Sequence, residues 1–229
     1  MEQLPNGYTL NLTPGAFPLS TDSMVLAHFA KLPKKATVLD LGSGCGTLGL
    51  LLCAGTDNCS VTGMELDENA HLAAMENIRR NDLAHRMESI CGDLRQLPRD
   101  FTGRFDCCVS NPPYFSGGPA ASRTPLARRE DCCAPAELFD AAAKALKFGG
   151  DFFLVHKPER LAELIVRGGE RNLEAKRLLL LRHRENGPIA LIFLQFRKGG
   201  KPGLKIEEAS LFDHNNEPTV FFKNVYHTA

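Results

Sequence analysis

Residues 38–46 read Val-Leu-Asp-Leu-Gly-Ser-Gly-Cys-Gly, an apolar run that leads directly into three closely spaced glycines. The apolar run is typical of a buried β-strand, and the glycines after it are typical of a tight loop. Glycine lets the backbone approach a ligand closely, because no side chain blocks the way. The stretch therefore predicts a binding loop at the carboxyl end of a parallel strand, where open α/β sheets bind their ligands.

From Ala36 onward, apolar strand-like runs alternate with helix-like stretches. Strands are predicted at residues 37–41, 60–64, 87–91, 105–110, 150–156, 175–181 and 189–196, and helices at 47–54, 68–81, 135–146 and 159–167. This alternation favours a mostly parallel sheet with helices on both faces. Only Asn186-Gly187-Pro188 joins the last two strands, which predicts an antiparallel hairpin there. The predicted fold class is α/β, with a Rossmann-like, doubly wound sheet of seven strands ending in that hairpin.

The composition is that of an ordinary soluble domain. The chain has 229 residues, of which 43% are hydrophobic and 24% are charged. We expect residues 1–30 to form an extension over the binding loop and residues 31–229 to form one domain. No secretory signal and no apolar run of the roughly 18 residues needed to span a bilayer is visible, so a cytoplasmic location is expected. The eight cysteines include no Cys-x-x-Cys pair, which favours packing roles over a metal site.

The glycine spacing indicates which kind of ligand the loop holds. Its third glycine falls at position 46, one residue earlier than the dinucleotide-binding pattern requires. Asp40 places a carboxylate beside the loop, which suits the cationic aminopropyl group of an adenosyl donor better than a pyrophosphate. The residues predicted to form this part of the donor site are Asp40, Gly42, Ser43, Gly44 and Gly46.

Acidic residues end the next two predicted strands as well. Glu65 can accept hydrogen bonds from both hydroxyls of a ribose, and Leu66 follows it at the same site. Asp67 is predicted to cap the following helix instead. Asp93 can accept a hydrogen bond from the adenine amine, with Leu94 behind the ring, although an ordinary loop aspartate is the alternative.

A second distinctive turn follows the predicted strand at 105–110. It reads Asn111-Pro112-Pro113-Tyr114, and its prolines stiffen it, because each fixes its own φ and restricts the residue before it. The Asn111 side-chain oxygen and the Pro112 carbonyl can then accept hydrogens from a planar amine and stabilise the positive charge that develops when the amine attacks an electrophile. Tyr114 can stack on a flipped base. We predict that these four residues are catalytic, that Asn111 also contacts the donor, and that no metal is needed.

The glycine loop and this turn, in this order, resemble the two halves of a class I S-adenosylmethionine-dependent methyltransferase. Residues 17–27, 122–130 and 211–219 extend the resemblance over nearly the whole chain, to the bacterial tRNA adenine-N6-methyltransferases that modify the adenine beside the anticodon of valine tRNA. The resemblance implies S-adenosylmethionine as donor, S-adenosylhomocysteine as product and tRNA as substrate. It also places Thr21 and Asp22 on a helix over the donor, with Asp22 as a simple N-cap as the alternative.

Other acceptors remain open, because the same turn occurs in guanine-N2 RNA methyltransferases and in glutamine-N5 methyltransferases of release factors. The latter usually carry a helical domain before the sheet, where only about 30 residues precede it here. A non-catalytic RNA-binding module is a third alternative. Basic residues favour RNA, and we expect no membrane and no obligate protein partner. The predicted RNA contacts are Arg123, Arg128 and Arg129. Eight Lys or Arg residues between positions 176 and 205 are expected to assist them, because that stretch contains only one acidic residue.

Overall fold

A computed structural model describes residues 2–4, 7–12, 19–55, 59–113 and 134–226 of the chain. Four residues singled out above, Tyr114, Arg123, Arg128 and Arg129, lie outside the described residues. The described part contains both the glycine loop and the first three residues of the Asn-Pro-Pro-Tyr turn. The donor half of the candidate site and the start of the acceptor half can therefore be built from their contacts.

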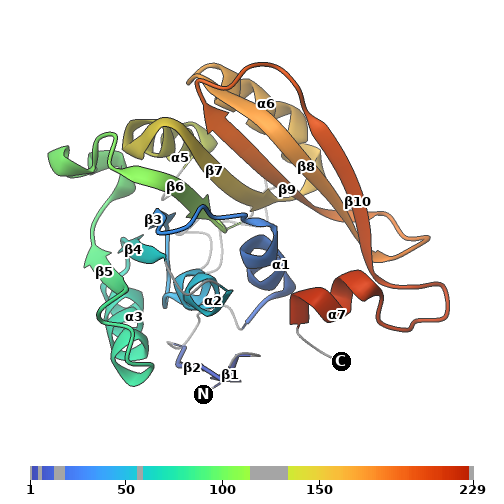
Figure 1. The fold of residues 1–229 in the computed structure, drawn as a ribbon, viewed down its shortest axis with the longest axis horizontal. Coiled ribbons are helices and arrows are strands. Elements are labelled where there is room, and N and C mark those ends of the chain that lie inside the picture. The colour runs from blue at the N-terminus through green and yellow to red at the C-terminus, as the bar shows by residue number, and fades with distance from the viewer. Residues whose placement is uncertain (1, 5–6, 13–18, 56–58, 114–133, 227–229) are drawn as a thin grey trace, which may run out of the picture.

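A mixed sheet of eight strands forms the centre of the molecule (Figure 1). Its order is β10-β8-β9-β7-β6-β3-β4-β5, and all neighbours are parallel except where β9 pairs with β7 and β8. The strands are β3 (Thr37–Leu41), β4 (Ser60–Glu65), β5 (Met87–Cys91), β6 (Phe105–Ser110), β7 (Leu146–His156), β8 (Leu173–Arg184), β9 (Ile189–Lys198) and β10 (Lys205–Phe212).

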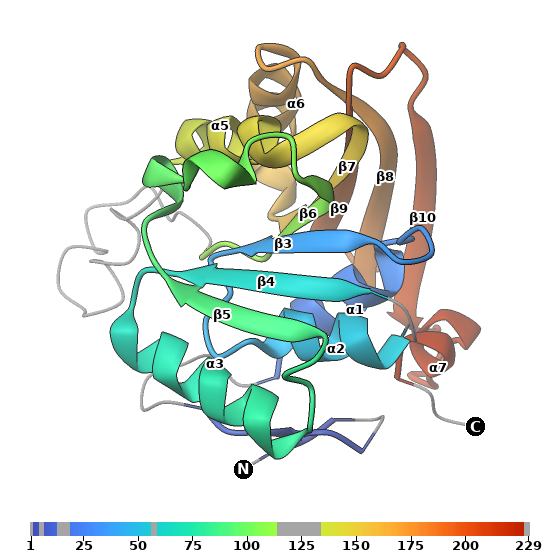
Figure 2. The same cartoon turned by 60° about the vertical axis from the view of Figure 1, so that its left-hand side comes forward.

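Helices cover both faces of this sheet (Figure 2). One face packs against α1 (Thr21–Phe29), α2 (Thr47–Gly55), α3 (Glu68–Arg80) and α7 (Val220–Tyr226), and the other against α5 (Pro135–Ala145) and α6 (Leu161–Gly169). Short 3-10 turns lie at η1 (Leu94–Gln96), η2 (Arg99–Phe101) and η4 (Pro158–Arg160). Cys107 belongs to the first core and Cys108 to the second, so these adjacent cysteines point to opposite faces of β6.

The predicted count of seven strands is wrong by one, and the sheet does not end in the hairpin. The antiparallel hairpin of β8 and β9 is present, but β10 adds a parallel strand to the outer edge of β8. The sequence of β10 hides it, because Glu207 and Glu208 are unfavourable strand residues in isolation. In the folded chain these acids pair with Arg177 and Arg182 on the neighbouring strand. The tertiary partner thus overrides the local preference.

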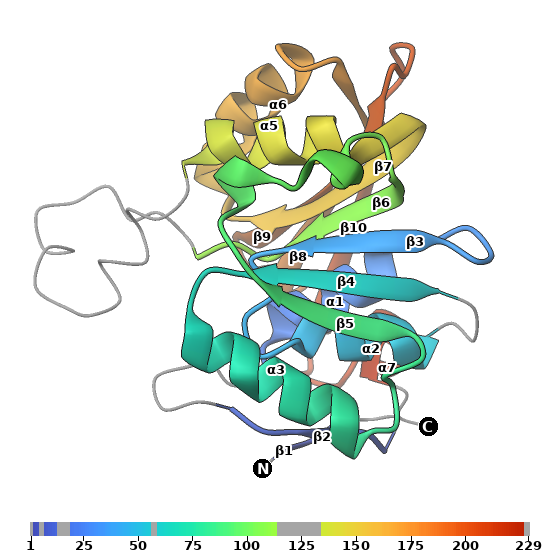
Figure 3. The same ribbon diagram turned by 90° about the vertical axis from the view of Figure 1, so that its left-hand side faces the viewer.

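Asn77 of α3 and Asn81, the C-cap of that helix, form paired hydrogen bonds with the backbone of the amino-terminal segment. The segment contains the two-stranded sheet of β1 (Glu2–Gln3) and β2 (Thr9–Leu10) beside α3 (Figure 3). The Asn81 amide pairs with the backbone N–H and C=O of Thr9, and the Asn77 amide pairs with those of Asn11, all at 2.8–2.9 Å. Asn77, which is fully buried, also donates to the Cys45 carbonyl of the glycine loop at 2.9 Å. The extension is therefore connected to the loop through one side chain.

Candidate functional site

The glycine loop leaves β3 in a left-handed conformation that explains its composition. Gly42, Gly44 and Gly46 have φ values of 75°, 55° and 82°, which side chains rarely tolerate. The backbone N–H groups of Gly42 and Ser43 both donate to the Met64 carbonyl of β4, at 3.0 and 3.1 Å. The loop is thus fixed to the neighbouring strand and forms a defined surface at the carboxyl edge of the sheet.

Glu65 joins the glycine loop to the loop that follows β4. One carboxylate oxygen accepts from the Gly44 N–H at 2.7 Å and the other from the Asp67 N–H at 2.8 Å. A carboxylate offers about four acceptor positions, so two remain for the hydroxyls of a ribose. Asp67 accepts from the Ala70 N–H and caps α3, which confirms the helix-capping prediction.

Asp40 is 1% exposed, and no hydrogen-bond partner for its Oδ2 exists among the described residues. Burial, and secondarily the negative charge of Glu65, raise the pKa of the Asp40 carboxyl to about 7. A buried carboxylate without a partner is costly, and a cationic group placed beside it would remove that cost. Ser43 Oγ is likewise buried, and nothing in the described part of the chain bonds it. These two orphan atoms flank the glycine loop and fit the cationic end of an adenosyl donor.

Gly63 of β4 provides a direct test of how tightly this loop is packed. A Cβ at position 63 would lie 2.8 Å from Ser43 Oγ and 2.9 Å from Ser43 Cβ, which forces the loop to shift. Because overpacking of this kind costs about 1–3 kcal/mol, we expect Gly63→Ala to lower the melting temperature by several degrees and to weaken ligand binding at the loop.

Calorimetry and thermal unfolding measure both effects. Gly169→Ala is the matched control, because a Cβ there meets no atom within 4 Å. Adding Ser43→Gly removes the clash, so the double variant is expected to recover much of the lost stability. An equal loss in the single and double variants would contradict the packing argument.

The residues predicted to lie near the adenine, Asp93, Leu66 and Leu94, differ in exposure and in polar contacts. Asp93 accepts hydrogen bonds from the side chain of Arg95 at 2.7–2.9 Å and from its backbone N–H, which lowers the pKa of the Asp93 carboxyl. Asp93 also caps η1, so it is more than an unstructured loop residue. Leu66 is 46% exposed beside Glu65, and Leu94 packs partly against the core. An exposed leucine next to the predicted ribose ligand leaves an apolar surface on which a flat ring can lie.

The acceptor turn begins on the strand next to the glycine loop. β6 pairs with β3, with Asp40 opposite Val109, and the Ser110 hydroxyl donates to the Leu41 carbonyl at 2.7 Å. Asn111 follows at once, and its Nδ2 donates to Ser23 Oγ of α1 at 3.0 Å. Asn111, Pro112 and Pro113 are all partly exposed. The structure therefore brings Asp40 and Asn111 to adjacent positions on one edge of the sheet.

α1 lies against this edge, although its cap differs from the predicted alternative. Ser20, and not Asp22, is the N-cap, since the Ser20 hydroxyl accepts from the Ser23 N–H at 3.3 Å. Asp22 lies in the first turn. The Tyr226 hydroxyl of α7 donates to Thr21 Oγ1 at 3.0 Å. Sequence reasoning missed Ser23 and Tyr226, because no local pattern marks either contact.

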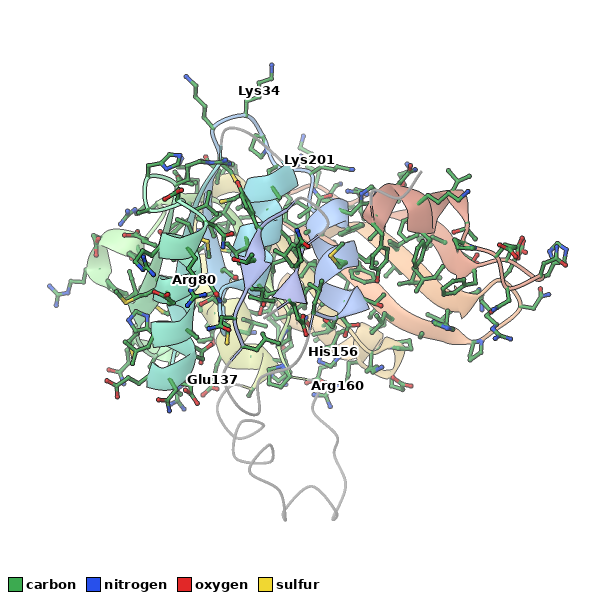
Figure 4. All side chains as sticks on the ribbon, turned by 90° about the horizontal axis from the view of Figure 1, so that it is seen from below. Lys34, Arg80, Glu137, His156, Arg160 and Lys201 are labelled. Atoms are coloured by element: carbon green, nitrogen blue, oxygen red, sulfur yellow. The ribbon has the colours of Figure 1, made fainter. Side chains whose placement is uncertain are left out.

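The basic stretch from 176 to 205 does not form one surface beside the site. Lys201 lies at the same end of the molecule as Lys34, which precedes β3. His156 and Arg160 lie at the opposite end, where the parallel strands of the sheet end (Figure 4). Six of the eight basic side chains have partners within the protein: Lys176, Arg177, Arg182, Arg197, Lys198 and Lys205.

Burial lowers the pKa of His156 to about 4, so its imidazole at the carboxyl edge of the sheet is neutral.

Two further observations concern the described residues. They contain no cluster of three or more His, Cys, Asp or Glu side chains that could hold a metal ion. None of the helices in the described ranges combines the length and the apolar character needed to cross a membrane. The described part of the candidate site contains the glycine loop, the carboxylates of Asp40, Glu65 and Asp93, and the Asn111 amide.

Residues 19–168 match the sequence model of the family described as the methyltransferase small domain. The chain belongs to this family. The match covers the glycine loop, Glu65, Asp93 and the whole acceptor turn. Family membership confirms the prediction of a methyltransferase domain.

Two relatives illustrate the similarity within the family. A tRNA1(Val) (adenine(37)-N6)-methyltransferase from Shewanella sp. (strain W3-18-1) is 36% identical over 136 residues, which are 58% of this chain and 57% of the relative. The chain thus matches a little more than half the length of that relative. A protein of the same name from Histophilus somni (strain 2336) is 26% identical over 223 residues, which are 95% of this chain and 92% of the relative.

Solved structures confirm the fold. A predicted O-methyltransferase from Agrobacterium tumefaciens superposes with a TM-score of 0.75 at 19% identity, over 91% of this chain and 96% of that one. A putative RNA methyltransferase from Pyrococcus horikoshii gives a TM-score of 0.54 at 21% identity, over 78% and 83% of the two chains. The predicted Rossmann-like α/β architecture is therefore confirmed.

Proposed function

We propose that this protein is an S-adenosylmethionine-dependent methyltransferase that modifies the exocyclic N6 of an adenine in tRNA. The observation that carries the proposal is the position of Asn111 directly after β6, the strand that pairs with β3 and its glycine loop. An amine held by Asn111 lies beside whatever the loop binds. The names of the relatives favour adenine over the guanine and glutamine acceptors that share the turn.

Each donor-site residue is proposed to contact a particular part of S-adenosylmethionine. When bound, S-adenosylmethionine supplies a methyl group on a cationic sulfur. Asp40 faces the cationic aminopropyl end, and Glu65 accepts hydrogen bonds from the ribose hydroxyls. Leu66 and Leu94 flank the adenine, and Asp93 accepts from its amine while it shares its charge with Arg95. The left-handed glycines leave room for the donor to approach the backbone.

The acceptor half explains how a weak nucleophile reacts. The lone pair of an aromatic amine is delocalised into its ring, so attack requires a more pyramidal nitrogen. Asn111 Oδ1 and the Pro112 carbonyl accept one hydrogen each and favour that geometry, and their dipoles stabilise the positive charge as it develops. The methylated ammonium then loses a proton to solvent. Pro113 stiffens the turn, and Tyr114 is proposed to stack on the base.

The names of the relatives support tRNA as the substrate. Arg123, Arg128 and Arg129 are proposed to contact tRNA phosphates, and the protein is proposed to act in the cytoplasm. Thr21 and Asp22 are proposed to contribute to the donor site from α1, which packs at the same edge as Asn111.

Donor binding is expected to strengthen as the pH rises through about 7. The pKa of Asp40 is raised, so the folded protein keeps a proton that the unfolded chain releases near pH 4. The stability from this group is therefore full below about pH 4 and is lost as the pH rises through about 7. A cationic donor prefers the ionised form, so affinity should rise roughly five- to tenfold from about pH 6 to about pH 8.

Calorimetry at both pH values measures this change. Asp40→Asn is expected to bind more weakly and to lose the part of the pH dependence that Asp40 causes, while any titration of the ligand itself persists. Equal pH dependence in the two proteins would contradict the role given to Asp40.

The macromolecule that accepts the methyl group decides between the enzyme alternatives. The protein is incubated with methyl-labelled S-adenosylmethionine and, in separate reactions, with unmodified total tRNA or with purified release factors. We expect label in the RNA only. Label in the release factors would support the glutamine acceptor instead, and donor binding with no transfer to either would support a binding module.

A further inference from the structure

Ser23 contacts the amine-holding residue from the other side of the site. It is the third residue of α1 and is 7% exposed, and 88 positions separate it from Asn111 in the sequence. Its Oγ accepts a hydrogen bond from Asn111 Nδ2 at 3.0 Å. The Ser20 hydroxyl caps α1 through the Ser23 N–H at 3.3 Å, which fixes the turn that carries Ser23. The first turn of α1 therefore contacts the nitrogen end of the Asn111 side-chain amide.

The two ends of an asparagine amide do opposite things to a substrate amine. The oxygen accepts hydrogens, whereas the NH2 group only donates. An NH2 group aimed at the acceptor amine would face its hydrogens without bonding them. The turn alone does not choose between the two orientations, because a half-turn about χ2 exchanges the oxygen and the nitrogen. In the structure the nitrogen end of the amide faces α1, because Asn111 Nδ2 donates to Ser23 Oγ.

We propose that Ser23 is a positioning residue: its Oγ holds Asn111 Nδ2 toward α1 and thereby leaves Asn111 Oδ1 to accept a hydrogen of the substrate amine. The inference rests on the proposed function of Asn111. It adds a residue from α1 that acts on the reacting amine only through Asn111.

Turnover of Ser23→Ala tests this role. We expect kcat to fall roughly three- to tenfold, the scale of one neutral hydrogen bond, with the donor Kd unchanged. The same substitution should cost nothing further in Asn111→Ala, whose residual turnover is read with labelled donor. Ser23→Thr keeps the hydroxyl and should retain most of kcat. Ser60→Ala is the control, since it removes an exposed serine hydroxyl at the start of β4 and leaves α1 unchanged.

A spectroscopic measurement separates this inference from the proposed function. The side-chain amide resonances of Asn111, assigned by their loss in Asn111→Ala, should shift in Ser23→Ala and remain near their original positions in Ser60→Ala. A shift without any methyl transfer by the wild-type protein would overturn the function and keep the contact. Unshifted resonances, wild-type turnover in Ser23→Ala, or an equal loss in the presence and absence of Asn111 would overturn the positioning role.

Discussion

Replacing Asn111 by alanine is expected to lower turnover about a hundredfold or more while donor affinity stays near that of the wild type. The magnitude is that of losing one preorganised partner of the transition state. The affinity is preserved because the glycine loop and Glu65 hold each other through the backbone contact of Gly44, without help from Asn111. The substitution therefore separates the chemistry from the binding of the donor.

Single-turnover kinetics and calorimetry on the same preparation measure the two quantities. Asn215→Ala is the matched control, because that asparagine is exposed in the loop after β10, and its turnover should stay within about twofold of wild type. Wild-type turnover in Asn111→Ala on the accepted substrate would remove the amine-holding role from this residue.

Glu65→Ala is expected to weaken donor binding about ten- to a hundredfold. A charge-assisted hydrogen bond contributes roughly 1.5–3 kcal/mol, and the ribose contacts are of this kind. The substitution also leaves the N–H groups of Gly44 and Asp67 without their acceptor, so both loops lose an anchor. We expect a lower melting temperature in addition to the weaker binding.

Calorimetry with S-adenosylmethionine measures the affinity, and Glu76→Ala provides the control. Glu76 is a carboxylate on the surface of α3 whose partners are Arg79 and Arg80, so its loss should leave donor affinity unchanged. Equal affinities for wild type and Glu65→Ala would show that the donor is not held at the tip of β4.

Local patterns were sufficient to predict several structural elements. The glycine loop, the capping role of Asp67 and the hairpin between β8 and β9 each depend on residues within a few positions of one another. In such cases backbone sterics and hydrogen bonds within the segment decide the structure. The sequence could therefore predict these elements without knowledge of the tertiary fold.

Contacts between distant segments could not be predicted in the same way. Ser23 meets Asn111 across 88 positions, and Asn77 meets Asn11 across 66. β10 pairs with β8 in parallel, and the arginines of β8 lie beside its glutamates, which no window of its own sequence reveals. The positive charge of the stretch from 176 to 205 was overestimated for the same reason, since its counter-charges Asp151, Glu207 and Glu208 come from other strands.

Analysis of the methylated nucleoside tests the central claim most directly. Unmodified total tRNA is incubated with the protein and methyl-labelled S-adenosylmethionine, digested to nucleosides and analysed by mass spectrometry, with Asn111→Ala in parallel. The account predicts labelled N6-methyladenosine in the wild-type reaction and almost none with the variant. Labelled N2-methylguanosine, or RNA that carries no label while a release-factor glutamine does, would contradict it.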